Sequence, residues 1–331
     1  MTAWNKLRRR IMTPDLRQTK LSTRGFHLKD EQARDRLETV GSSFLHGFAA
    51  AAEADGPPEA APAVESTPVA YRGFAYEGAA MAFAIRDALP GRSRHVARFL
   101  ADHDEHVYMA YVGVGWAMAR LPRPLWSRLY APDALLRWLV LDGYGFHQAY
   151  FKTDRYVRRR HAPSAFPWPA AGARDYSRDY SLRAIDQGIG RACWFVAGTD
   201  AGQLVRLLDA FPAHRRPDLY AGAGLAVCYA GGASERELNW LARSAGEYRL
   251  ELAQGAAFGA AARQRAGLVM PHNELATGVL CGMPVNEATR VTEEARSGLP
   301  ADDVLPAYEI WRQRISSAFV PSVATRKPSE Q

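Results

Sequence analysis

The chain has 331 residues, of which 47% are hydrophobic, so it can bury a large core in one or two domains. Its net charge of +7 comes almost wholly from residues 1–26, which contain seven Lys and Arg residues and a single Asp. Because the rest of the chain is nearly neutral, a basic groove for nucleic acid is not expected. No uninterrupted apolar run approaches the roughly 20 residues that a membrane span requires.

The N-terminus is charged but lacks the apolar centre of a secretory signal. The three cysteines form no CxxC pair and are typical of small core residues in a reducing compartment. We therefore expect a cytoplasmic protein. Its basic N-terminus is either solvated or docked on an acidic partner or an anionic membrane surface.

Three segments precede the main body of the chain. Residues 1–26 are predicted to form a basic, irregular arm. Residues 27–52 are predicted to contain a helix, because Leu37, Phe44 and other apolar residues recur at helical intervals. Residues 53–70 are rich in Pro, Ala and Glu, which is typical of a linker.

A short glycine signature recurs six times in the remaining body, residues 71–319. Each copy has small residues at its first and third positions and aromatic or long apolar residues after them; the copies begin at Gly78, Gly113, Gly143, Gly188, Gly222 and Gly255. This spacing is close to one helix–turn–helix unit per copy, and small residues let helices approach closely. The pattern predicts an all-α, solenoid-like array of antiparallel helix pairs. An α/β protein with sharp strand-to-helix turns is the alternative.

Three further segments complete the expected organisation. The segment His161–Asp175 lengthens one repeat and is predicted to be an inserted loop. A helix over Leu305–Phe319 is predicted to cap the array. Residues 320–331 are predicted to be disordered.

Acidic residues stand beside several signature glycines and are candidates for proton transfer. If equivalent helix starts face one groove, their carboxylates line it together. Helix N-capping explains the same residues without any function. Two histidines and the acidic residue of one Pro-led helix start are added to these carboxylates. The catalytic candidates are therefore Asp142, His147, Glu77, Asp186, His272 and Glu274. A packed core histidine and a Pro-led helix start are the alternatives for His147 and for residues 271–274.

Aromatic residues are frequent just after the signature. They pack a core at helical spacing or line a tunnel for a long apolar ligand. The ligand-binding candidates are Phe83, Trp116, Tyr144, Tyr150 and Trp194, and Phe146, Phe151 and Tyr229 follow the signature in the same way.

Motifs for cofactors and metals are missing. Gly113 and Gly115 lack the acidic residue that should close a dinucleotide-binding strand, and neither a Walker loop nor a GxSxG motif occurs. His103 and His106 are not accompanied by any Glu-x-x-His pattern. We therefore expect no recognisable cofactor and no metal site.

Several long strings carry a family resemblance that covers nearly the whole chain. They include LRRRIMTPDLRQTKLSTRGFH, RGFAYEGAAMAFAIRDALP, LDGYGFHQAYF and DLYAGAGLAVCYAGG. The chain resembles the UnbL-type family, which is encoded beside iterative polyketide synthases in actinobacterial enediyne gene clusters. The resemblance implies a role in forming or tailoring an enediyne core from a synthase-made polyene. It assigns no reaction and no catalytic residue.

Two functional hypotheses remain open. In the first, the protein is an enzyme or an enzyme subunit that binds a linear polyene in an aromatic-lined groove. In the second, it is a non-catalytic adaptor that holds the polyketide synthase, its acyl carrier domain or a membrane-bound pathway partner through the basic arm.

Overall fold

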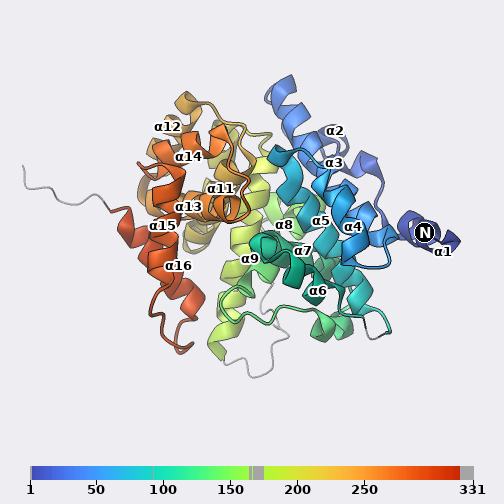
Figure 1. Cartoon of the computed structure of the whole chain (residues 1–331). Coiled ribbons are helices and arrows are strands. Elements are labelled where there is room, and N and C mark those ends of the chain that lie inside the picture. The colour runs from blue at the N-terminus through green and yellow to red at the C-terminus, as the bar shows by residue number, and fades with distance from the viewer. Residues whose placement is uncertain (1, 92, 164–165, 167–174, 321–331) are drawn as a thin grey trace, which may run out of the picture.

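The computed structural model describes residues 2–91, 93–163, 166 and 175–320 (Figure 1). Regular structure in these residues is helical, without strands, which confirms the all-α class against the α/β alternative. The signature helices are α5 (Val69–Ala88), α7 (Val107–Arg120), α8 (Trp138–Phe151), α9 (Asp175–Val196), α11 (Arg216–Ala230) and α13 (Arg249–Arg265). The other α-helices are α1 (Ala3–Met12), α2 (Leu21–Arg24), α3 (Glu31–Glu53), α4 (Pro57–Glu65), α6 (His95–Asp102), α10 (Ala201–Asp209), α12 (Glu235–Ser244), α14 (Pro271–Leu280), α15 (Val285–Arg296) and α16 (Ala307–Ala318).

The glycine signature lies inside the helices and brings their backbones into contact. A Cβ atom added at Gly188 would overlap the carbonyl oxygen of Asp142 on the preceding signature helix. The same holds for Gly222 against Gln187. In both cases the carbonyl belongs to the residue just before the previous signature. Consecutive helices therefore touch at equivalent positions, and the repeat encodes one crossing used again and again.

The predicted antiparallel pairs consist of a long signature helix and a shorter helix that returns the chain. His95, at the start of α6, stacks on Phe83 late in α5, at 5.6 Å between ring centroids. His106, which follows α6, stacks on Tyr76 near the middle of α5. The return helices α10, α12 and α14 pack on one another outside α9, α11 and α13. The long signature helices lie inside this outer layer and surround the interior of the molecule (Figure 1).

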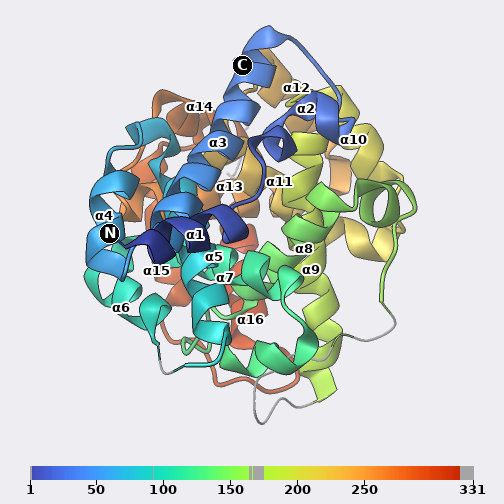
Figure 2. The same cartoon turned by 90° about the vertical axis from the view of Figure 1, so that its right-hand side faces the viewer.

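The N-terminal segment is folded onto the body, so the prediction of an irregular arm was wrong. Thr2 caps α1 through its hydroxyl, which accepts from the backbone N–H of Asn5. Helix α1 packs against α3 (Figure 2). The guanidinium of Arg8 donates to the carbonyl oxygens of Ala52, Glu53 and Ala54 at the end of α3. These carbonyls are left without partners by the ending helix, and a guanidinium with several donors satisfies them.

The expected linker over residues 53–70 is largely helical, so this prediction was also wrong. Helix α4 starts at Pro57, and proline suits a first helical turn because the N–H it lacks is unpaired there anyway. Ala60 and Val64 are buried against the body. Composition suggested a loop, but burial of these small residues stabilises a helix.

The prediction of a last helix near residues 305–319 is confirmed. Helix α16 packs against α13 and α15 and buries Tyr308, Trp311 and Ile315. Most of the predicted insertion His161–Asp175 lies outside the described residues, as do residues 321–331 of the predicted tail.

Candidate functional site

A narrow pocket lies in the middle of the array. Side chains of α3, α5, α7, α8, α9 and α11 line it, and Pro14, Gln18 and Thr19 of the N-terminal segment add to one wall. It comprises about 820 Å³ of space between atoms with its open mouth included, yet the centre of a water molecule can reach only about 70 Å³. The pocket is therefore narrow, and its shape suits a thin or flat ligand better than a bulky one.

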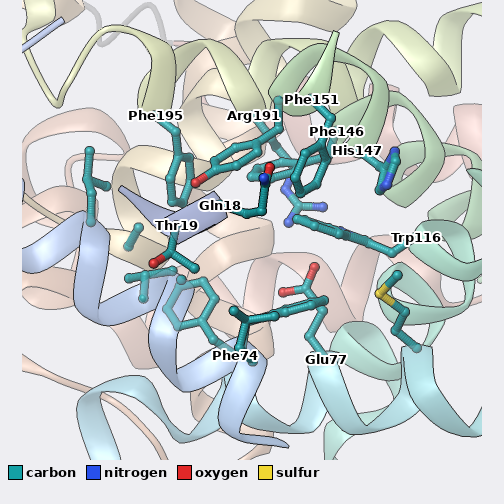
Figure 3. Close-up of a pocket in the computed structure, with 18 of the residues that line it drawn as sticks. Gln18, Thr19, Phe74, Glu77, Trp116, Phe146, His147, Phe151, Arg191 and Phe195 are labelled. Atoms are coloured by element: carbon teal, nitrogen blue, oxygen red, sulfur yellow. The ribbon is translucent and has the colours of Figure 1, made fainter. Parts of the chain in front are cut away.

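Aromatic side chains form a large part of the pocket walls (Figure 3). The ring of Trp116 lies 4.5 Å from that of Phe44 and 5.3 Å from that of Phe146, measured between centroids. Phe195 meets Phe146 edge-on at 5.2 Å. Rings held against each other in this way offer rigid apolar faces, which favour a planar or unsaturated ligand.

Glu77 is the most unusual group in the pocket. Its side chain on α5 is 3% exposed, and its carboxyl group points into the space between the helices (Figure 3). Burial raises the pKa of Glu77 to about 7, although the positive charge of Arg191 opposes the rise. The group can therefore hold or release a proton near neutral pH, which is the property required of an acid–base catalyst.

Arg191 brings a fixed positive charge to the same space. It is buried on α9, lines the pocket and forms an ion pair with Asp142 of α8. Gln187 donates a second hydrogen bond to this carboxylate, 2.9 Å from its Nε2 to Oδ2 of Asp142. Burial alone would lower the pKa of Arg191, but the carboxylates of Asp142 and Glu77 raise it, so the guanidinium stays charged.

His147 also lines the pocket, but as a neutral ring. It is 8% exposed and lies between Phe151, at 4.7 Å, and Trp116, at 5.4 Å between ring centroids. Burial, assisted by the charges of Arg120 and Lys152, lowers the pKa of His147 to about 3. The imidazole can accept or donate a hydrogen bond, but it is not a cation at physiological pH.

Three residues that line the pocket have a buried polar atom without a hydrogen-bond partner. These atoms are Nε1 of Trp116, Nδ1 of His147 and the hydroxyl oxygen of Tyr229, which lies against Gly73 outside the pocket lining. The indole N–H is directed towards the Glu77 carboxyl without reaching ordinary hydrogen-bond geometry. Buried polar atoms are rarely left unpaired in native proteins, so the nitrogen atoms of Trp116 and His147 are suited to meet a polar group.

The structure brings together only part of the predicted catalytic set. Glu77 and His147 line the pocket, and Asp142 stands behind Arg191. None of Glu77, Asp142 or Asp186 caps a helix, because each lies within a helix rather than at its start. The expectation that their carboxylates line one groove was therefore wrong, as was the capping alternative.

The other catalytic candidates have structural partners elsewhere. Asp186 is buried in a two-bond ion pair with Arg215, at 2.8 and 2.5 Å. His272, at the start of α14, packs on the backbone of Gly231. Burial lowers the pKa of His272 to about 4. Glu274 accepts from the backbone N–H of Val285 at 3.0 Å. The Pro-led helix start proposed as the alternative for residues 271–274 is what the structure shows.

Two of the five predicted ligand residues, Trp116 and Tyr150, line the pocket. Phe83 instead packs under α6, and Tyr144 packs against Trp126. Trp194 is buried and donates to the carbonyl oxygen of Gly231 at 3.0 Å. The signature alone could not separate these roles, because its helices bury residues on more than one side.

Sequence reasoning missed Arg191, which has the only charged side chain inside the GIGRACWFV string. A charged residue in such an apolar stretch is rarely buried unless it is paired. The sequence at this position could therefore have indicated a buried ion pair. Phe44, Phe74 and Phe195 of the walls were missed as well, since they lie outside or at the edge of the signature.

The described residues also provide two negative observations. No group of three or more His, Cys, Asp or Glu side chains in them is arranged to hold a metal ion. None of their helices is both long and apolar enough to cross a membrane.

Replacing Glu77 with glutamine should change how stability depends on pH. In the wild type the raised pKa means that the folded state keeps a proton between about pH 4.5 and 7, where the unfolded state releases it. Stability therefore falls as pH rises through this window, by up to about 3 kcal/mol. Glu77→Gln should gain that amount relative to the wild type at pH 8, but not at pH 4. Urea unfolding at both pH values measures the difference in stability between the variant and the wild type. If this difference does not depend on pH, the pKa of Glu77 is not raised as described.

No curated protein and no solved structure matches this chain. A family model described as a protein of unknown function, DUF1702, matches residues 3–319, and the chain therefore belongs to the DUF1702 family.

Proposed function

We propose that the protein binds a linear polyene in its central pocket and takes part in converting that polyketide intermediate towards an enediyne core. The observation that carries the proposal is the narrow aromatic pocket with a buried, proton-exchanging carboxyl group at Glu77. The resemblance of the sequence to proteins encoded in enediyne clusters supplies the identity of the ligand. A cytoplasmic location belongs to the same proposal.

The chemistry proposed for the pocket is proton transfer. Glu77 accepts a proton from the bound chain or gives one to it, since its pKa lies near the working pH. The guanidinium of Arg191 favours negative charge that develops on the ligand during the transfer. Trp116 and His147 hold a ligand oxygen through their unpartnered nitrogen atoms. An oxidation of the polyene would need an oxidant supplied by a partner.

The alternative function is a non-catalytic adaptor for the polyketide synthase, its acyl carrier domain or a membrane-bound partner. This hypothesis relied on a free basic arm. Arg8 and Arg9 are engaged with the end of α3 instead, which leaves fewer basic groups available for such a partner.

The two functions differ in what happens to the bound polyene. We expect the purified protein to bind synthase-derived linear polyene and to catalyse the exchange of the polyene's protons with solvent. Mass spectrometry after incubation in D₂O, with absorption spectroscopy of the conjugated system, measures both. Polyene that binds but takes up no deuterium and keeps its spectrum would favour the adaptor.

Three variants locate the activity. Ala226→Phe on α11 and Val40→Phe on α3 both fill the pocket and should weaken binding at least about tenfold, because close-packed aromatic bulk excludes the ligand. Glu77→Gln should bind polyene but lose about 100-fold or more in exchange rate. Thermal unfolding shows whether each variant folds. Wild-type exchange in Glu77→Gln would remove the proposed catalytic role.

A further inference from the structure

Helix α1 presents an apolar stripe to solvent. Trp4, Leu7 and Ile11 are 63%, 47% and 70% exposed. Since a helix turns about 100° per residue, this spacing places all three on one face. The opposite face holds the buried Asn5 and packs against the end of α3. Single exposed apolar residues are ordinary, but three on one face of a ten-residue helix form a contiguous patch.

Basic residues flank the stripe on the outward side of the same helix. Lys6 and Arg10 are exposed, and neither makes an ion pair with a described residue. The nearby acidic groups are already engaged. Glu53 pairs with Arg9 at 2.6 Å, and Asp55 accepts a hydrogen bond from Asn5 at 2.8 Å. The exposed face of α1 is therefore apolar and positively charged together.

This combination fits an anionic lipid surface better than another copy of the chain. Tryptophan and basic side chains are both favoured at the bilayer interface, where the ring meets the acyl boundary and the cations meet lipid phosphates. A second copy would oppose the same basic groups, so like charges disfavour self-association through this face. With ten residues, α1 is too short to span a bilayer and would lie in the interface plane.

We propose that α1 docks the protein on an anionic membrane, with Trp4, Leu7 and Ile11 entering the headgroup region and Lys6 and Arg10 contacting lipid phosphates. The same N-terminal segment continues to Gln18 and Thr19, which line the central pocket. Docking through α1 does not depend on the function proposed for that pocket.

Co-sedimentation of the full-length protein with phosphatidylcholine vesicles, with and without phosphatidylserine, tests the docking. We expect binding to the phosphatidylserine vesicles only, and weaker binding as salt is raised, because salt screens the basic groups. Trp4→Ser/Leu7→Ser/Ile11→Ser should lower the partition coefficient at least about tenfold. Lys6→Gln/Arg10→Gln should remove most of the preference for the anionic lipid. Trp240→Ser is the matched control, since Trp240 is 41% exposed on α12, and it should bind as the wild type does.

Three results would overturn the proposal. The first is no binding to either kind of vesicle. The second is undiminished binding by the triple serine variant. The third is a wild-type dimer that the serine changes convert to a monomer while vesicles are ignored, which would make the face a self-association surface. Ala226→Phe, which blocks the pocket, should still bind vesicles. The polyene-binding and vesicle-binding measurements therefore distinguish a failure of polyene binding from a failure of membrane docking.

Discussion

Gly188→Ala should destabilise the protein by about 3 kcal/mol or more, which is a large part of the roughly 5–15 kcal/mol that stabilises a typical native protein. The added methyl group would overlap the backbone carbonyl of Asp142 on α8, and a backbone atom cannot move aside as a side-chain end can. Relief requires α8 and α9 to separate, which would also disturb the pocket between them. Urea unfolding followed by circular dichroism measures the loss.

Gly278→Ala is the matched control for this prediction. Gly278 is exposed within α14, and no atom lies within 4 Å of an added Cβ. The same substitution there should raise stability by about 0.4–1 kcal/mol, because alanine loses less backbone entropy on forming a helix. Equal effects at the two positions would mean that the close crossing of α8 and α9 does not exist.

Removing the buried cation should have an effect of similar size. Arg191→Met leaves the Asp142 carboxylate without its ion-pair partner in the interior, and such a change costs about 3–5 kcal/mol. Arg191 also lowers the pKa of Glu77, so the variant should hold that carboxyl group protonated to higher pH. Because a raised folded-state pKa means stability that is lost as pH rises, the destabilisation should be smallest in acid and grow towards pH 8.

A double-mutant cycle separates the ion pair from packing. Asp142→Asn/Arg191→Met removes both charges, so it should be more stable than Arg191→Met alone, by about 1–3 kcal/mol. Denaturant unfolding of the four proteins at pH 8 gives the coupling energy. A double variant as unstable as the sum of the single ones would show that Arg191 acts only by filling space.

Much of the architecture could be predicted from the local pattern. The recurrence of small residues from Gly78 to Gly255 predicted helical pairs, because a position without a side chain matters most where backbones meet. Apolar spacing similarly predicted the last helix. The failures are at residues 1–26 and 53–70, where charge and proline suggested loops. Burial of Val64 and the contact of Arg8 with the end of α3 stabilise helices there, and neither is visible in the local sequence.

The candidate site was predictable only in part. Glu77, His147 and Trp116 were candidates from the sequence, and all three line the pocket. Asp186 looks equivalent to them in the sequence, yet it faces Arg215 elsewhere. A helix has several buried sides, and neighbouring positions point about 100° apart, so spacing alone does not say which side meets the pocket.

The sequence by itself favoured an all-α chain over an α/β one, indicated that its helices cross through glycines and determined that its basic charge is gathered at one end. Only the tertiary structure decided that Arg191 faces Glu77, that the N-terminal segment forms one wall of the pocket and that α1 turns its apolar stripe outwards. The physical reason is the range of the interactions. Helix formation depends on residues a few positions apart, and a glycine marks locally where another helix can approach. Arg191 and its buried partner Asp142, in contrast, are 49 residues apart in sequence.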